Sequence, residues 1–332
     1  MQRTARIIAA AALLFASCAS APPAFSADAH VSIKMSTSLP ASDPVGQGAT
    51  RFKQLVEQRS HGTISVQIYP NNQLGGENEV LQQVKQGSIQ IAVTAAGTAG
   101  NLVPDISVMD APYVWKDWKH EYRVMTGGGV FAHFAKEFSD TQGLRLLSAM
   151  WFYGLRDLTA NKPVRKPEDA KGMKIRTPPA PVNLLAGRVL GGEPTPMNYP
   201  QVYLALKTGT IDAEENPLPT ILSGKLYEVQ KYVILTKHIQ QSQVVSMNMA
   251  FWKGLSKEQQ QAVQSAADDA GKYETGLAQK AEAADLKKLQ GMPGVTVIAH
   301  PDIAAFRARA KQLAPELKSK WGDLYEKITS QQ

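Results

Sequence analysis

Two arginines near the middle of the chain, Arg156 and Arg176, are of a type that could hold a small anion. Arg176 ends a short β-type run and precedes Pro178-Pro179, which stiffen the backbone that follows. A planar guanidinium offers two parallel N–H donors that match the two oxygens of a carboxylate. Arg156 lies twenty positions earlier, on what reads as an adjacent strand. Each arginine could instead form a structural ion pair, Arg156 with Asp157 or Glu168.

Enzyme motifs are missing from the sequence. It contains no Gly-x-Ser-x-Gly and no His-Glu-x-x-His, and its six histidines are dispersed. Gly127-Gly128-Gly129 lacks the Lys and the Ser or Thr of a phosphate-binding loop. The sequence therefore predicts no catalytic residues, no cofactor and no metal ligands. A periplasmic enzyme is the alternative.

The formal charge of the 332-residue chain is +7, from 36 basic and 29 acidic residues. Excess positive charge suits nucleic acids, anionic membranes or acidic small molecules. The basic residues are scattered rather than clustered with aromatic ones, so we expect an anionic solute and no nucleic acid. The length suits two domains.

The first 26 residues have the pattern of a secretory signal peptide. Arg3 and Arg6 form a basic segment, and a short apolar run at 7–15 follows. Ala24-Phe25-Ser26 fits the cleavage site, which would make the mature protein start near Ala27 and place it in the periplasm.

The single cysteine, Cys18, lies within this segment. A lipid anchor on Cys18 is the alternative, but Phe15 stands where a Leu-like residue is expected. The sequence favours removal of Cys18 with the signal peptide.

Strand-like and helix-like segments alternate along the rest of the chain, which is typical of an α/β fold with a largely parallel sheet. The expected strands are 31–35, 64–69, 89–93, 155–160, 174–176, 211–214, 232–236 and 295–298. The expected helices are 47–59, 77–85, 182–190, 201–207 and 302–325.

One further helix, over 256–289, is unusually long. Ser256 and Gln259 have the spacing of a capping box. The helix would approach ~50 Å and should cross between domains. Two shorter helices with a kink near Gly271 are the alternative.

Several short motifs together resemble the extracytoplasmic solute receptors of tripartite ATP-independent periplasmic (TRAP) transporters, the DctP family. They occur in order over nearly the whole mature chain. They are Tyr69-Pro70 with Gln73-Leu74-Gly75, Val84 to Gly87, Lys162-Pro163-Val164 with Pro167-Glu168-Asp169, Gly172-Met173-Lys174-Ile175-Arg176, Tyr203 to Gly209, Asp212 to Pro217, and Tyr227 to Tyr232.

The resemblance implies a two-domain periplasmic binding protein fold with discontinuous domains, hinge strands and one long domain-spanning helix. We expect residues 27–150 plus 242–280 in domain I and 151–241 plus 281–332 in domain II. It also implies a monomeric receptor that delivers an organic acid to TRAP permease subunits in the inner membrane. A receptor that feeds a sensor kinase is the alternative.

The resemblance also assigns ligand-binding residues. Arg176 would pair with the ligand carboxylate, Arg156 would support it, and Asn216 would orient a carboxylate or a hydroxyl. Glu214 stands where similar receptors have a neutral Gln, so a cleft-facing Glu214 would suit a hydroxyl or amino group on the ligand. Further positions that match the cleft of similar receptors are Tyr199, Pro178, His238, Glu77 and Ser38.

The expected ligands are C4-dicarboxylates, 2-oxo or 2-hydroxy acids, uronic acids and aromatic acids. Receptors of the sialic acid branch have Glu and Arg where this chain has Ala95 and Thr98, which argues against sialic acid. Trp151, Phe152 and Tyr153 could favour an aromatic acid, or could belong to the core.

Overall fold

The computed structural model describes residues 30–127 and 129–330. The expected signal peptide and Cys18 lie outside the described residues.

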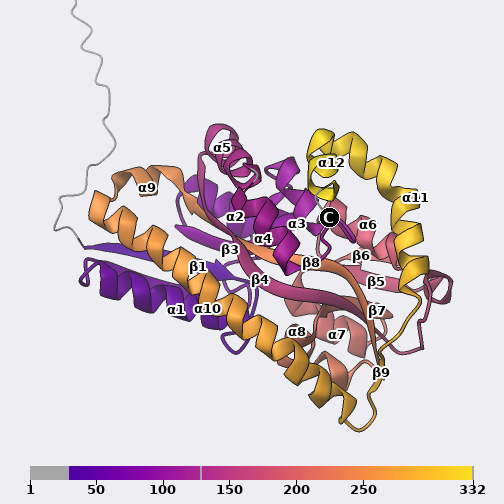
Figure 1. Cartoon of the computed structure of the whole chain (residues 1–332). Coiled ribbons are helices and arrows are strands. Elements are labelled where there is room, and N and C mark those ends of the chain that lie inside the picture. The colour runs from indigo at the N-terminus through magenta and orange to yellow at the C-terminus, as the bar shows by residue number, and fades with distance from the viewer. Residues whose placement is uncertain (1–29, 128, 331–332) are drawn as a thin grey trace, which may run out of the picture.

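One nine-stranded sheet runs through the molecule in the order β2-β1-β3-β8-β4-β7-β5-β6, and β9 pairs with β8 (Figure 1). The strands are β1 (Val31–Thr37), β2 (Ile64–Tyr69), β3 (Ile91–Ala95), β4 (Leu144–Ala160), β5 (Lys174–Thr177), β6 (Glu193–Pro196), β7 (Ala213–Pro217), β8 (Tyr232–Asn248) and β9 (Thr296–Ile298).

The sheet is mixed. β1 pairs in parallel with β2 and β3, β5 pairs in parallel with β6 and β7, and β8 with β9, whereas β3–β8, β8–β4 and β4–β7 are antiparallel. The prediction of parallel strands is therefore right within each end of the sheet and wrong at its centre. There, β4 and β8 are 17 residues long and run from one end to the other.

The helices lie on the two faces of the sheet. They are α1 (Pro44–Arg59), α2 (Glu77–Gln86), α3 (Ala96–Ala99), α4 (Trp118–Gly127), α5 (Val130–Gln142), α6 (Pro181–Val189), α7 (Val202–Lys207), α8 (Leu218–Ser223), α9 (Met249–Gly254), α10 (Lys257–Gln290), α11 (Ile303–Trp321) and α12 (Asp323–Thr329). Short 3-10 turns are η1 (Pro104–Asp110), η2 (Pro167–Ala170), η3 (Tyr199–Gln201) and η4 (Leu226–Glu228). We call β1–β3 with α1–α3 the first lobe, and β5–β7 with α6–α8 the second lobe.

The long helix α10 is continuous over 34 residues, and the Ser256–Gln259 capping box is present at its start. It packs on α1 and β4 and then on α8 and β9, so it crosses from one lobe to the other (Figure 1). The alternative of a kink at Gly271 is wrong. Gly271 is a packing site, because a Cβ there would lie 2.5 Å from Cδ1 of the Trp151 indole ring.

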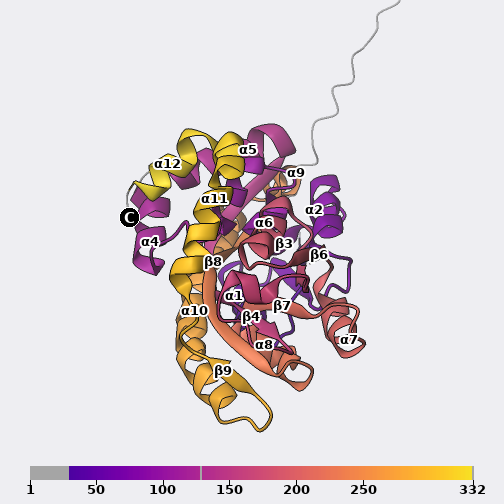
Figure 2. The ribbon, with the colours of Figure 1, turned by 90° about the vertical axis from the view of Figure 1, so that its right-hand side faces the viewer.

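Two helical regions differ from the sequence prediction. The helix expected over 302–325 is two helices, because Gly322 turns the chain with a φ of 50°. In Figures 1 and 2 these helices, α11 and α12, return over the sheet from the end of β9. As a result, Trp321 and Ile328 join the same apolar cluster as Phe134 of α5. The sequence analysis identified neither α4 nor α5.

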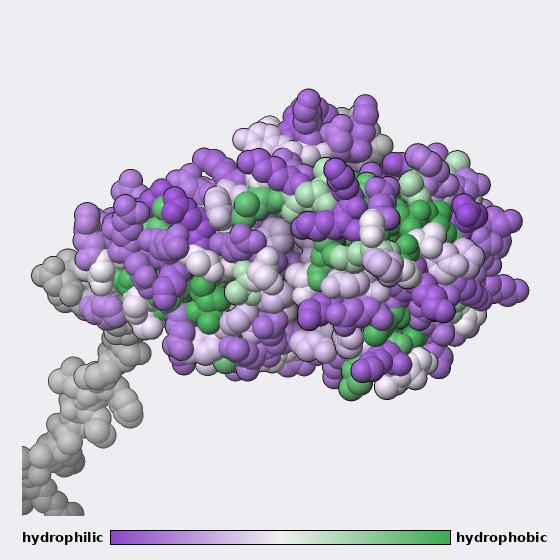
Figure 3. Space-filling view, turned by 90° about the horizontal axis from the view of Figure 1, so that it is seen from below, coloured by the Kyte–Doolittle hydropathy of each residue, from purple (hydrophilic) through white to green (hydrophobic). Residues whose placement is uncertain are grey.

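The face of the molecule shown in Figure 3 is largely polar. On the face seen in Figure 3, hydrophilic residues dominate and apolar residues form separate patches. In the described part of the chain, no helix has the length and apolar character needed to cross a membrane.

The two lobes touch each other over the centre of the sheet. Asn78 at the start of α2 donates to the Pro179 carbonyl of the second lobe over 3.2 Å. Asn101, which follows α3, donates to the same carbonyl over 3.1 Å. The structure is therefore a closed arrangement of the lobes.

Candidate functional site

A cavity lies where the lobes meet. The lining includes seven of the eight predicted ligand-binding residues: Ser38, Glu77, Arg156, Arg176, Pro178, Tyr199 and Asn216. Segments that are distant in the sequence therefore converge on one site.

Arg176 is held at the end of β5 with most of its donors unused. Its Nε donates to the Met197 carbonyl over 2.8 Å, and no described residue accepts a hydrogen bond from either terminal nitrogen. The side chain is only 3% exposed, and burial lowers the pKa of its guanidinium. The Tyr199 ring lies 6.0 Å from the guanidinium carbon. Arg176 is thus a buried cation with two free donor nitrogens that can face an anion.

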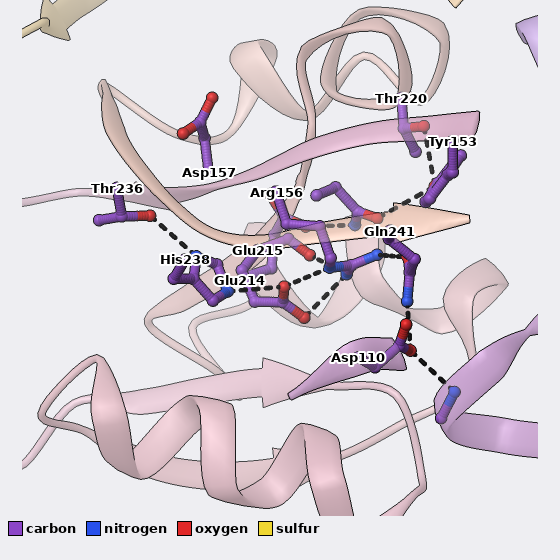
Figure 4. Close-up of polar contacts among 12 residues, drawn as sticks. Asp110, Tyr153, Arg156, Asp157, Glu214, Glu215, Thr220, Thr236, His238 and Gln241 are labelled. Carbon is purple, nitrogen blue, oxygen red and sulfur yellow. Dashed lines mark hydrogen bonds and ion pairs between the residues drawn. The ribbon is translucent and has the colours of Figure 1, made fainter. Parts of the chain in front are cut away.

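Arg156 on β4 has the opposite character. Its Nε and Nη2 both contact the Glu215 carboxylate, and its Nη1 donates to Oε1 of Gln241 over 2.8 Å (Figure 4). Burial favours the neutral form of Glu215, but Arg156 and His238 outweigh it and hold the pKa of Glu215 at about 2. Arg156 does form an ion pair, as the alternative interpretation expected, but its partner is Glu215 on β7 and not Asp157 or Glu168.

The positions of the two arginines also differ from the prediction. β7 lies between β4 and β5 in the sheet, so Arg156 and Arg176 are not on adjacent strands. They reach the same cavity from either side of β7.

His238 does not line the cavity. It is fully buried, with Nε2 3.1 Å from Oε2 of Glu215 and Nδ1 2.9 Å from the Thr236 hydroxyl (Figure 4). His238 therefore supports the carboxylate that holds Arg156, and its prediction as a cavity residue is wrong.

Asn216 on β7 faces the cavity with its amide held from two sides. Its Nδ2 donates to Oε2 of Glu214 over 2.6 Å, and its Oδ1 accepts from the Tyr153 hydroxyl over 3.2 Å. Glu214 does not line the cavity; it is fully buried and also accepts from Thr159. The condition of a cleft-facing Glu214 is therefore not met, and the ligand group inferred from it does not follow. Burial raises the pKa of Glu214 to about 7.

The first lobe supplies the opposite wall. Glu77, at the first position of α2, accepts from the Ser38 hydroxyl over 2.9 Å and from the Ala95 amide over 3.2 Å. Its carboxylate is the acidic group on this wall of the cavity. It can accept a hydrogen bond from a hydroxyl group but would repel a second carboxylate.

The sequence analysis did not assign several amide residues to the cavity. Asn72 and Asn198 lie in loops, and Gln241 and Gln243 lie on β8. The run Gln240-Gln241-Ser242-Gln243 is polar but fills the middle of a buried strand, and this unusual composition was the available signal. Of the aromatic residues 151–153, Tyr153 lines the cavity, whereas Trp151 is fully buried and donates to the Ala267 carbonyl.

One group of side chains elsewhere has the composition of a metal site. Asp105, His133 and Glu137 have ligand atoms within 4.8 Å of one another on η1 and α5. His133 Nε2 lies 2.7 Å from Asp105 Oδ2, a distance that a hydrogen bond between the two side chains explains. None of the three residues lines the cavity.

Comparisons with known proteins agree with this architecture. The profile of the family described as "Bacterial extracellular solute-binding protein, family 7" (DctP) matches residues 35–320. The sialic acid-binding periplasmic protein SiaP of Vibrio cholerae is 34% identical over 90% of this chain and 92% of its own. The 2,3-diketo-L-gulonate-binding periplasmic protein YiaO of Escherichia coli is 36% identical over 78% of each chain.

Solved structures give the same result. A TRAP periplasmic solute binding protein from Bordetella bronchispeptica, with density interpreted as pantoate, superimposes with a TM-score of 0.85 and 34% identity, covering 91% of this chain and all of its own. One from Polaromonas, bound to D-erythronate, has a TM-score of 0.85 and 29% identity, covering 91% of this chain and 98% of its own.

The family match spans residues 35–320, and the solved relatives share the fold over 91% of the chain. The cavity between two lobes and the crossing helix α10 are therefore those of a periplasmic receptor rather than an enzyme, and the chain belongs to the DctP family of TRAP transporter solute-binding proteins.

Proposed function

We propose that this receptor binds a small hydroxylated monocarboxylic acid between its lobes and delivers it to a TRAP permease in the inner membrane. The observation that carries the proposal is the state of Arg176. Its two terminal nitrogens have no described acceptor, although the residue is almost completely buried. A buried cation of this kind gains most from a bidentate carboxylate.

The charges around the cavity favour one carboxylate on the ligand rather than two. Arg156 is already neutralised by Glu215, so Arg176 alone among the lining residues has positive charge to offer. Glu77 on the opposite wall is acidic. A dicarboxylate would bring its second charge to a place without a free cation, where burial is costly.

The rest of the lining suits hydroxyl groups. Amide side chains both donate and accept hydrogen bonds, as hydroxyl groups do. The cavity is lined by five of them, at Asn72, Asn198, Asn216, Gln241 and Gln243. Similar receptors were solved with sugar acids, among them L-galactonate and L-fuconate. An acid of this type matches the charge and polarity of the site.

Sialic acid is a poor match in spite of the resemblance to SiaP. Ala95 stands at the cavity wall, and Thr98 is fully buried and lies outside the lining. Neither can replace the charged side chains that the sialic acid branch has at these positions.

The expected mechanism is closure of two domains about β4, β8 and α10. The proposed division assigns 27–150 plus 242–280 to one domain and 151–241 plus 281–332 to the other. The acid would dock on Arg176 in the open form, and contacts such as Asn78 with Pro179 would then close over it. The receptor would act as a monomer and present its closed form to the permease.

A thermal-shift screen tests this proposal. The exported protein, refolded to remove bound solute, is mixed with D-erythronate, L-galactonate, L-fuconate, pantoate, succinate and sialic acid. An acid at 100 times its dissociation constant should add ~2.7 kcal/mol of stability. We expect the largest shift from a hydroxylated monocarboxylate.

Two variants complete the screen. Arg176→Met should lose the shift, whereas Arg188→Met should keep it, because Arg188 forms an exposed ion pair with Glu316. A larger shift with succinate than with any monocarboxylate would overturn the proposed ligand class. An unchanged shift in Arg176→Met would remove Arg176 from the site.

A further inference from the structure

A row of hydrogen bonds leads from the cavity residue Asn216 to the first lobe. The Tyr153 hydroxyl lies 3.2 Å from Oδ1 of Asn216 and 2.8 Å from the Thr220 hydroxyl. The Thr220 hydroxyl lies 2.9 Å from Oδ2 of Asp43. At the other end, Nδ2 of Asn216 donates to Glu214. We call these five residues the interlobe relay; Figure 4 shows its central part.

Asp43 belongs to the first lobe, and its partners belong to the second. Its side chain caps α1 by accepting from the Val45 amide over 3.1 Å. Thr220 and Ser223 reach it from α8, Ser223 over 3.2 Å. The residue is fully buried. The relay therefore joins the two lobes behind the ligand cavity.

The relay needs one more proton than its ionised form contains. Four oxygens follow one another: Oδ2 of Asp43, the hydroxyls of Thr220 and Tyr153, and Oδ1 of Asn216. Three contacts separate these four oxygens, but the two hydroxyl groups supply only two protons. With Asp43 ionised, one contact places two oxygens together with no hydrogen between them. A protonated Asp43 completes the series, with each group donating to the next toward Asn216.

We propose that Asp43 is a proton-binding latch: closure of the lobes brings Asp43 onto Thr220 together with one proton, and this proton fixes the amide of Asn216 at the ligand. Asp43 is thus a positioning residue that acts on the ligand through Asn216. The proposal concerns closure and does not depend on which acid the cavity holds.

Comparing the open and closed forms gives the direction in which pH shifts the equilibrium between them. In an open form Asp43 separates from Thr220, so the remaining two contacts are satisfied by the two hydroxyl protons. Burial raises the pKa of Asp43 from 3.8 to about 6 in the closed form. The closed form therefore gains from protonation below about pH 6, and this gain is lost as the pH rises through that value.

Other charged groups face Asp43 from the elements around it. Asp285 on α10 adds to the rise in its pKa. Glu274, also on α10, is fully buried, and both of its carboxylate oxygens lack a partner among the described residues. Burial, with Asp43 nearby, raises the pKa of Glu274 well above its usual value. Tyr199 and Tyr153 complete the surroundings; burial raises the pKa of both.

The far end of the relay has its own charged neighbours. Glu214 is fully buried beside Glu215, which raises the pKa of Glu214, and beside Arg176, which lowers it. If the Asn216 amide is rotated by about 180°, its Nδ2 faces Tyr153 and Glu214 would donate to its Oδ1. Each group would then donate to the next in the direction of Asp43. In that arrangement the extra proton lies on Glu214 and Asp43 is ionised, so a pH dependence of affinity that persists in Asp43→Asn would identify it and overturn the latch.

The test is the pH dependence of affinity in three variants. D-erythronate and L-galactonate are titrated separately at pH 5, 6, 7 and 8. For the wild type we expect the dissociation constant to rise about tenfold between pH 5 and pH 8, with most of the change below pH 7. Asp43→Asn should bind at pH 8 as the wild type does at pH 5, because Asn caps α1 and its amide donates to Thr220 at every pH.

Thr220→Val and Glu274→Gln serve as the matched variants. Thr220→Val breaks the relay, so its affinity should be weaker than that of the wild type at pH 5. Asp43 stays buried in this variant, and burial is the main cause of its raised pKa, so a pH dependence should remain. Glu274→Gln changes a buried acid on α10 that lies near Asp43 but forms no hydrogen bond with the relay, so the wild-type pH dependence should remain. A wild-type pH dependence in Asp43→Asn would overturn the proposal.

A measurement on the ligand-free protein tests the latch even if neither sugar acid binds. Fluorophores on cysteines introduced at the exposed positions Gln82 of α2 and Lys207 of α7 report the distance between the lobes. The closed fraction of the wild type should increase as the pH falls from 8 to 5, and that of Asp43→Asn should be high and constant. A closed fraction of the wild type that does not change with pH would contradict the latch.

Discussion

Arg156 and Arg176 reach the same cavity, but their surroundings differ in one decisive respect. Arg156 has a carboxylate and an amide for its donors, all within the second half of the sheet. Arg176 has one carbonyl, on its Nε. Both are at least 97% buried, so desolvation costs the two guanidinium groups a similar amount. The protein compensates that cost for Arg156 and does not compensate it for Arg176; in the proposed function the ligand carboxylate does so.

This difference separates folding from binding. A residue whose partners are all present in the unliganded protein contributes to stability, and its loss leaves those partners unpaired. A buried cation without partners lowers stability until an anion arrives, and it then contributes to affinity. Motif similarity assigns both arginines to the ligand, whereas the contacts give them different tasks.

The largest expected effect comes from replacing each arginine by Met and measuring chemical denaturation without ligand. Arg156→Met leaves Glu215 buried beside His238 alone, so the free energy of unfolding should fall by about 3–5 kcal/mol. Arg176→Met removes a poorly compensated charge. Its unfolding free energy should be unchanged, or higher by about 1 kcal/mol.

Double substitution provides the control. In Arg156→Met with Glu215→Leu, the unpaired carboxylate is removed, so part of the lost stability should return. An equal loss of stability in Arg156→Met and Arg176→Met would show that the two arginines have the same role, and the comparison would fail.

The sequence could predict the elements but not this difference. Local signals define α10 and β1 to β3: the Ser256–Gln259 capping box, helical spacing and period-two alternation act over a few residues. Whether Arg156 is paired depends on Glu215, 59 positions later, and on the insertion of β7 between β4 and β5. Neither follows from local spacing.

The errors have similar causes. His238 matched a cavity position, but its side chain points to Glu215 because β8 carries it behind the cavity. The break at Gly322 follows from docking of Trp321 and Ile328 onto the core cluster of α5, which is a tertiary contact. Gln241 and Gln243 were missed because polar residues in a strand are usually read as solvent-facing.

Glu214 and Glu215 differ in the pKa of their carboxyl groups, and this difference gives the second-largest expected effect on stability. Arg156 keeps Glu215 ionised, with a pKa of about 2, whereas Arg176 fails to offset burial at Glu214, whose pKa is about 7. Glu214 thus takes up a proton on folding. The stability from this proton is complete below about pH 4.5 and is lost as the pH rises through about 7.

Replacing Glu214 by Gln should therefore raise the free energy of unfolding by about 1–3 kcal/mol at pH 8 and change it little at pH 5. Denaturation curves at the two pH values measure the difference. Asp157→Asn is a suitable companion, because burial raises the pKa of Asp157 to about 8 while the residue lies outside the cavity lining. A gain in Glu214→Gln that is equal at both pH values would show that Glu214 is ionised throughout.

The smallest expected effect contrasts the two walls of the cavity, with Arg176 on one and Glu77 on the other. Glu77→Gln keeps an acceptor for Ser38 or for the Ala95 amide but removes the negative charge. The affinity for L-galactonate should fall about threefold and that for succinate should rise about threefold, because the second carboxylate no longer meets an acidic wall. Titration of both acids into both proteins gives the ratio directly. If the two affinities move in the same direction, Glu77 acts only as a support for Ser38 and β3. Selection against dicarboxylates then has to come from Arg176, because it is the one free cation among the described residues of the lining.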